Sequence, residues 1–141
     1  MAGNSQIIIY TTEKGETKLE VRLEDETVWL TQKQMAELFQ TTSQNITIHL
    51  KNNFEEAELN EAATCKDFLQ VGKEGSRMVE RSQKFYNLEA IISVGYRIKS
   101  RVATRFRQWA TKHISEYIVK GFVLDDERPK NPIYRTIILK N

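Results

Sequence analysis

TQKQMAELFQTTSQNITIHLKN (residues 31–52) contains two short amphipathic segments separated by a polar gap. Thr31 followed three residues later by Gln34 is typical of a capping box, in which both side chains satisfy backbone N–H groups that a first helical turn leaves unpaired. The apolar residues that follow predict one buried helical face: Met35, Leu38 and Phe39. A helix is therefore predicted from Thr31.

The second segment is predicted to be another helix. It begins near Thr41 or Thr42, because Thr41 and Gln44 repeat the capping pattern. Three apolar residues recur at every fourth position and define an edge facing the core: Ile46, Leu50 and Phe54. The remaining positions are mostly polar, so the other side of this helix is predicted to face outward.

The two segments together fit a helix-turn-helix that reads DNA. Ala36 is small enough for the helices to touch, while Phe39 and Ile46 bracket the turn. Glutamine and asparagine amides can pair with adenine, and isoleucine methyls can meet the thymine methyl. The residues that we expect at the DNA are Thr42, Ser43, Gln44, Asn45, Thr47, Ile48 and Lys51.

A surface helix that binds nothing is the alternative interpretation. Gln40 occupies the turn position where such motifs usually carry glycine, so it must adopt a left-handed or alternative turn at some strain. Many unrelated helix pairs also share this degenerate pattern. The segment alone therefore leaves both interpretations open.

Strand signals precede the two helices. Residues 6–10 and 17–23 are rich in β-branched side chains, and the second range alternates with period two. Gly15 lies between them, which predicts a hairpin. Residues 24–30 predict an acidic turn followed by a short strand.

A second hairpin is predicted after the helix pair. Residues 55–61 are acidic and loop-prone. Residues 67–71 and 77–87 then favour strands around a Gly-rich turn at 72–76, whose tip is expected to project. We expect this tip to lie near a flanking groove of the DNA.

Two helices are predicted next. Asn87 can cap a short helix that ends at Gly95, and residues 96–100 form a connector. The longest helical signal covers residues 101–121 and ends at Gly121. Its apolar face is formed by Val102, Phe106, Trp109, His113 and Tyr117.

The predicted fold class is α+β: a helix-turn-helix flanked by β-hairpins, then a short helix and a long basic amphipathic helix. Residues 1–121 are expected to form a DNA-binding domain. Residues 122–141 are expected to be a linker and a C-terminal extension, with linker-like composition at 125–132 and a strand at 133–141.

Charge is unevenly distributed along the chain. Residues 1–75 carry 7 Lys and Arg against 13 Asp and Glu, whereas residues 76–121 carry 10 against 3. A basic half suggests a polyanionic partner, although the two halves can also attract each other. The cations assigned to phosphate contact follow helical spacing without acidic partners: Arg97, Lys99, Arg101, Arg105 and Lys112.

Catalytic patterns are weak, so we expect no enzyme, cofactor or metal site. His49 and His113 lack the spacing of metal ligands, and His113 lies on the predicted buried face. Cys65 has no flanking nucleophile motif, and Gly72 with Gly75 does not form a phosphate loop.

The same sequence indicates a cytoplasmic protein. No apolar run approaches the roughly 18 residues that span a bilayer, and the first residues lack signal-peptide features. A lone cysteine fits a reducing compartment.

Three segments carry a family resemblance: residues 26–59 (ETVWL to EEAEL), 86–122 (YNLEAIISVG to YIVKGF) and 124–131 (LDDERPKN). They resemble the virulence-associated RhuM family of bacterial proteins, in the same order and spacing. The later half, with FRQW leading to YIVKG, is similar to Bro-N domains of antirepressor-type proteins, often likened to the KilA-N group. Full-length family members continue further, which implies a C-terminal region absent from this chain.

The resemblance implies a DNA-binding role tied to mobile elements. The leading interpretation is therefore a double-stranded DNA-binding domain of a transcriptional regulator or antirepressor-type protein. A homodimer is expected to suit this role, because two-fold symmetric proteins match palindromic DNA sites. The alternative is a module that binds a repressor-like protein through the acidic cluster of Glu55, Glu56, Glu58 and Glu61.

Overall fold

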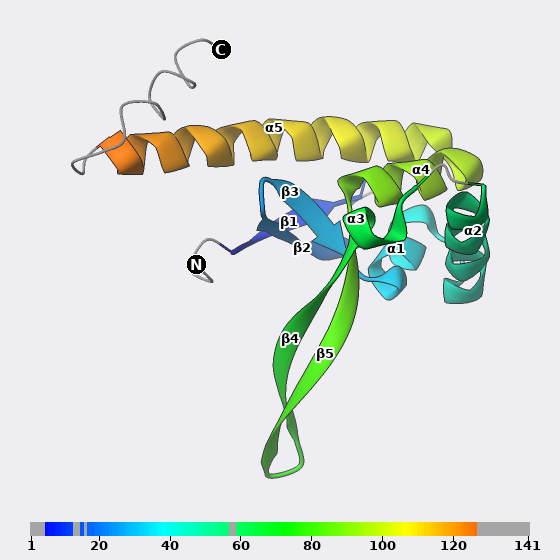
Figure 1. Cartoon of the computed structure of the whole chain (residues 1–141), viewed down its shortest axis with the longest axis horizontal. Helices are drawn as coiled ribbons and strands as arrows, with labels where there is room; N and C mark the ends of the chain where they lie inside the picture. Colours follow the sequence, from blue (N-terminus) through cyan, green and yellow to red (C-terminus); the bar gives the residue numbers. More distant parts are fainter. Residues whose placement is uncertain (1–4, 13–14, 16, 57–58, 127–141) are drawn as a thin grey trace.

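One antiparallel sheet and a set of helices make up the residues that the structure describes (Figure 1). The structure is a computed structural model and describes residues 5–12, 15, 17–56 and 59–126. The predicted α+β class is confirmed. The elements are β1 (Gln6–Thr11), β2 (Lys18–Glu24), β3 (Thr27–Leu30), α1 (Gln32–Phe39), α2 (Ser43–Glu55), α3 (Glu61–Thr64), β4 (Cys65–Glu74), β5 (Arg77–Asn87), α4 (Leu88–Ile98) and α5 (Ser100–Asp126).

The sheet has the strand order β1-β2-β3-β5-β4, with every neighbouring pair antiparallel. β3 links the two halves, because Trp29 pairs with Asn87 and Leu30 pairs with Tyr86. The strands on either side of the α1–α2 segment therefore belong to one sheet. The end strands, β1 and β4, each leave one edge without a strand neighbour among the described residues.

The helices cover one face of the sheet at β1, β2 and β3. Alternation along β2 places Leu19, Val21 and Leu23 on the covered face, as the period-two pattern predicts. Phe39 from α1 and Phe106 from α5 are fully buried in the same core. The body of the protein is thus held by a core to which sheet and helices both contribute.

The second hairpin differs from its predicted form. Its strands pair as far as Glu74 and Arg77, so the turn contains Gly75 and Ser76 alone and the predicted turn at 72–76 is too long. Gly75 has a φ of 62°, a conformation that favours glycine in a two-residue loop. The long antiparallel pair β4–β5, here called the arm, extends away from the body on the side opposite α5 (Figure 1).

Gly95 does not end α4, and Gly121 does not end α5. α4 continues to Ile98, so Lys99 alone separates it from α5 and the predicted connector at 96–100 is wrong. A Cβ atom on Gly95 would lie 2.3 Å from Phe39 Cζ and 2.6 Å from Phe39 Cε1. Glycine is therefore present for close helix packing, since glycine inside a helix costs about 1 kcal/mol without terminating it.

The predicted strand at 133–141 and the linker residues from 127 onward lie outside the described residues. α5 itself reaches Asp126 and so continues into the range predicted to be linker. Within the described residues, no helix combines the length and the apolar character that crossing a membrane requires.

Candidate nucleic-acid interface

The α2 helix is fixed by its cap and by its apolar edge. Thr42 is the cap residue, and its hydroxyl accepts a hydrogen bond of 3.1 Å from the backbone N–H of Asn45. Thr41 therefore does not cap the helix, although the sequence pattern made it the alternative. Ile46 and Leu50 are buried in the core, so the opposite side of α2 faces solvent.

The outward side of α2 carries the predicted base-contacting residues. Gln44, Ile48 and Lys51 are exposed and, at about 100° per residue, point within one narrow sector of the helix. Ile48 is 54% exposed, which is notable for a large aliphatic side chain flanked by polar residues. Ser43 is also exposed. Gln44, Ile48 and Lys51 form the face that we call the α2 face, whereas Ser43 lies about 100° around the helix axis from Gln44.

The remaining predicted residues on α2 already have partners within the chain. The side-chain amide of Asn45 donates to the Thr41 hydroxyl at 2.9 Å. The Thr47 hydroxyl accepts from Gln32 Nε2 at 2.6 Å and donates to the Ser43 carbonyl at 3.0 Å. Like the cap Thr42, these two residues position the helix and its start rather than presenting unpaired groups.

The turn before α2 adopts the left-handed conformation, one of the two alternatives expected for Gln40. Gln40 has φ 55° and ψ 54°, and the N–H of Thr41 donates to the Ala36 carbonyl at 2.9 Å. The Gln40 side-chain oxygen accepts a hydrogen bond of 3.2 Å from Lys99 Nζ. This contact brings the α4–α5 junction, and with it a cation, beside the turn that begins α2.

Arg97 does not meet the expectation that the basic residues lack acidic partners. Its guanidinium lies 2.9 Å from a carboxylate oxygen of Glu56, the residue that follows α2. The two residues are 41 positions apart in the chain, so helical spacing could not reveal the pair. Arg97 is therefore a link between α2 and α4 and not a cation available to a phosphate.

The other predicted cations lie along α5 or just before it. Arg101 and Arg105 are exposed on its first two turns, close in sequence to the junction at Lys99. Lys112 is exposed as well, but it lies about 18 Å further along the helix axis from Ser100. The structure thus brings Lys99 to the start of α2 and leaves Lys112 distant from the junction.

The two ends of α2 differ in charge. The first turn contains no acidic residue, and a helix N-terminus carries a partial positive charge. The last turn bears Glu55, and Glu56 follows it. Beside this acidic end, a hollow of about 340 Å³ is bordered by Lys51, Phe54 and Glu61. The first half of α2 is therefore the less acidic half.

His113 and Cys65 make contacts within the fold, whereas the buried Nδ1 of His49 has no hydrogen-bond partner among the described residues. His113 is half-buried, its ring centroid lies 4.6 Å from that of Trp109, and its Nδ1 is 3.0 Å from the Trp109 carbonyl. His49 is also half-buried. Burial raises the pKa of the Cys65 thiol, which lies 3.0 Å from the Glu61 carbonyl. Among the residues described, no three His, Cys, Asp or Glu side chains gather where a metal ion could be held.

Tyr96 is an exposed aromatic residue that no pattern in the sequence indicates as a site residue. Hydrogen bonds to Thr104 and then to Arg107 hold the pKa of its phenol below the usual value. Both partners lie on α5, so these bonds tie α4 to α5 next to the junction. Tyr96 lies in the segment 96–100 that the sequence predicts to be a connector, so it belongs to no predicted helix face.

Comparison with known proteins identifies a family. The model of the virulence protein RhuM family matches residues 63–137, which is more than half of the chain and includes β4, β5, α4 and α5. No curated protein and no solved structure gives a significant match.

Proposed function

The chain belongs to the virulence protein RhuM family, and we propose that it binds double-stranded DNA by inserting the start of α2 into the major groove as the second helix of a helix-turn-helix. The observation that carries the proposal is the α2 face, where exposed Ile48 lies beside the exposed amide of Gln44. An amide can pair with adenine and an aliphatic side chain can contact the thymine methyl.

The anchoring of α2 supports this proposal. A recognition helix must project its outer side while its inner side is rigidly held. Ile46 and Leu50 hold the inner side in the core, and the Arg97–Glu56 ion pair ties the far end to α4. The N-terminal half, where such helices contact bases, is also the half without acidic residues.

Phosphate contacts are assigned to the cations near the α4–α5 junction. Lys99 lies beside the turn before α2, and Arg101 and Arg105 follow on α5. Lys112 completes the set as a more distant contact. Contacts of this kind fix position and supply affinity, whereas the α2 face supplies sequence preference.

The protein-partner alternative has weaker support. It relied on a cluster of acidic residues around the end of α2. Glu56 is paired with Arg97, and Glu61 lies 3.9 Å from Lys84. Glu58 lies outside the described residues. Carboxylates that are already paired within the chain attract a basic partner less strongly.

Selection from a random duplex pool tests the proposal directly. We expect enrichment of one short motif, with affinity that falls as salt rises. With about four phosphate contacts the slope of log affinity against log salt is expected near −3 to −4. No enriched motif together with a slope near zero would exclude DNA binding.

Two substitutions separate base contact from phosphate contact. Gln44→Ala is expected to weaken the selected site by about 1–3 kcal/mol and to relax preference at one base pair. Arg105→Ala is expected to weaken selected and random duplexes alike. Gln83→Ala, an exposed glutamine on the arm, is the matched control and should leave binding unchanged. Equal affinities of Gln44→Ala and Gln83→Ala for the selected duplex would show that α2 does not contact the DNA.

A further inference from the structure

The outer edge of the arm, which runs along β4, has no neighbouring strand among the described residues. β4 is ten residues long and lies at the end of the strand order, with β5 on one side. No strand pairs with its outer edge among the described residues. Unpaired backbone N–H and C=O groups along such an edge are a template for adding a further strand.

One face of the arm carries an exposed apolar stripe. Leu69, Val71 and Met78 are 68%, 60% and 67% exposed. Leu69 pairs with Ser82, Val71 with Glu80, and Met78 with Lys73, and these alternate positions lie on one face of the two strands. The stripe is remote from the core, since Phe68 is the last buried residue along β4.

We propose that the occupant of this edge is the β4 strand of a second copy of the chain, paired antiparallel about a two-fold axis at Gln70. This register places Asp67 opposite Lys73 of the second copy, and Lys66 opposite Glu74. Each pair joins opposite charges, and each occurs twice by symmetry. Directly opposite residues in antiparallel strands interact through their side chains.

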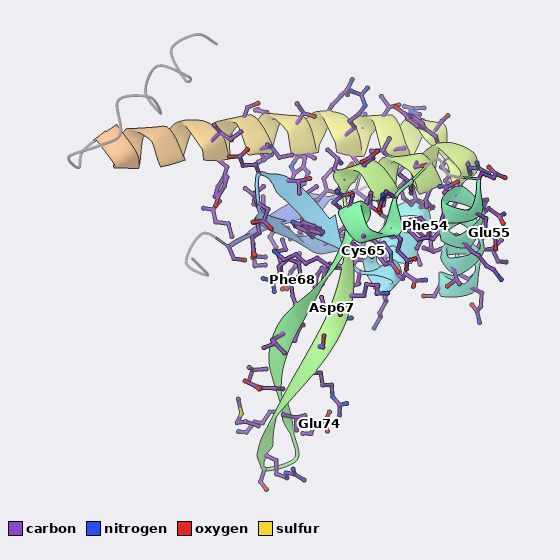
Figure 2. All side chains as sticks on the ribbon, in the orientation of Figure 1. Phe54, Glu55, Cys65, Asp67, Phe68 and Glu74 are labelled. Carbon is purple, nitrogen blue, oxygen red and sulfur yellow. The ribbon has the colours of Figure 1, made fainter. Side chains whose placement is uncertain are left out.

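The apolar residues agree with the same register. Leu69 lies opposite Val71 of the second copy, again twice, so the two stripes join on one face of a four-stranded ribbon. Figure 2 shows Asp67 toward the body and Glu74 toward the tip, the arrangement that lets two arms align in opposite directions. When two β4 strands run in opposite directions, each positive side chain of one strand thus lies opposite a negative side chain of the other.

Neighbouring registers lose this complementarity. A shift of one residue in one direction places Lys66 opposite Lys73, while the opposite shift places Asp67 opposite Glu74. Both shifts also separate Leu69 from Val71. A one-residue slip also turns one strand over relative to the other. The apolar stripe of one arm would then lie beside the polar face of the second arm.

The Asp67–Lys73 pair is the better one to test. In the other pair, Lys66 already contacts Asp25 at 2.6 Å and Glu24 at 3.6 Å within its own chain, and Glu74 is paired with Arg81. Asp67 and Lys73 are both exposed, so changing them leaves the core intact. The dimer is a property of the arm and does not depend on whether α2 binds DNA.

Charge exchange tests the interface by sedimentation across a range of concentrations. The unaltered chain is expected to form dimers, and Asp67→Lys or Lys73→Asp alone should weaken them about tenfold, since each creates two like-charge pairs. Asp67→Lys combined with Lys73→Asp should restore association. Lys18→Asp, an exposed charge reversal on β2, is the matched control and should have no effect.

Circular dichroism of each variant checks that the fold is retained. A chain that stays monomeric at every concentration would overturn the proposal. So would dimers that neither single change weakens, or a double variant that does not recover. DNA binding by a chain that remains monomeric would contradict the proposed dimer and would leave the proposed DNA-binding function in place.

A cross-link tests the position of the axis independently. In a Cys65→Ser background, Gln70→Cys places two thiols directly opposite each other, where mild oxidation should yield covalent dimers. Ser82→Cys is the control. The two β5 strands would be the outer strands of the ribbon, about 14 Å or three strand spacings apart, so the two cysteines should not form a disulfide. Equal cross-linking of both variants, or none for Gln70→Cys, would overturn the register.

Discussion

The body and the arm differ in how their residues are stabilised. In the body, side chains from the sheet and from four helices bury one another, with Phe39 and Phe106 fully enclosed. In the outer arm the strands pair with each other and with no underlying layer, so Leu69 and Val71 remain exposed. The exposed aliphatic residues of the outer arm thus need a reason other than folding of the monomer.

Truncating one large apolar residue in each region should give the largest contrast. Phe106→Ala removes a ring whose centroid lies 5.1 Å from that of Tyr10, and should lower the free energy of unfolding by about 3–5 kcal/mol. Leu69→Ala should change it by less than about 0.5 kcal/mol in dilute protein. Urea denaturation followed by circular dichroism measures both, and similar losses would contradict the division between body and arm.

Matched substitutions of glycine sharpen the same contrast. Gly95→Val forces methyl groups into Phe39 and Ala103 and should cost about 2–3 kcal/mol of unfolding free energy. A Cβ at Gly72, in the arm, meets nothing within 4 Å, so Gly72→Val should be neutral or slightly stabilising. The shift in thermal midpoint compares the two variants. A tolerated Gly95→Val would show that α4 can move away from α1.

The smallest effect is expected for an ion pair on the arm. Arg81 and Glu74 are paired across its two strands and both are exposed. Arg81→Ala should reduce global stability by no more than about 0.5 kcal/mol, because surface ion pairs are worth little. Hydrogen exchange by mass spectrometry should nevertheless show faster exchange confined to β4 and β5. Faster exchange in β2 as well would mean that arm and body open together.

Local signals in the sequence predicted several features correctly. Thr31 and Gln34 form the expected capping box, with hydrogen bonds of 3.1 and 2.9 Å. Asn87 caps α4 as predicted, accepting from the N–H of Ala90 at 3.1 Å. These interactions join groups three residues apart, so the sequence contains both partners within one helical turn.

Errors arose where a residue's role depends on a distant partner. Gly95 looked like a helix stop because the ring of Phe39 that it accommodates is remote in sequence. The apparent lack of an acidic partner for Arg97 had the same cause, since Glu56 is 41 residues away. Among the α2 residues predicted to contact DNA, Gln44 and Ile48 are exposed, whereas Asn45 is half-buried and its amide donates a hydrogen bond to Thr41.

The amino-acid order alone determined the helix caps, the period-two strands, the apolar edge of α2 and the reversed charges along β4, because each depends on neighbours in the chain or on spacing along one element. Tertiary packing alone decided that Thr47 on α2 meets Gln32 on α1, which cation is neutralised, and that β4 lies at an edge. Those outcomes depend on which elements meet in space, and contacts between residues some forty positions apart leave no periodic trace in the sequence.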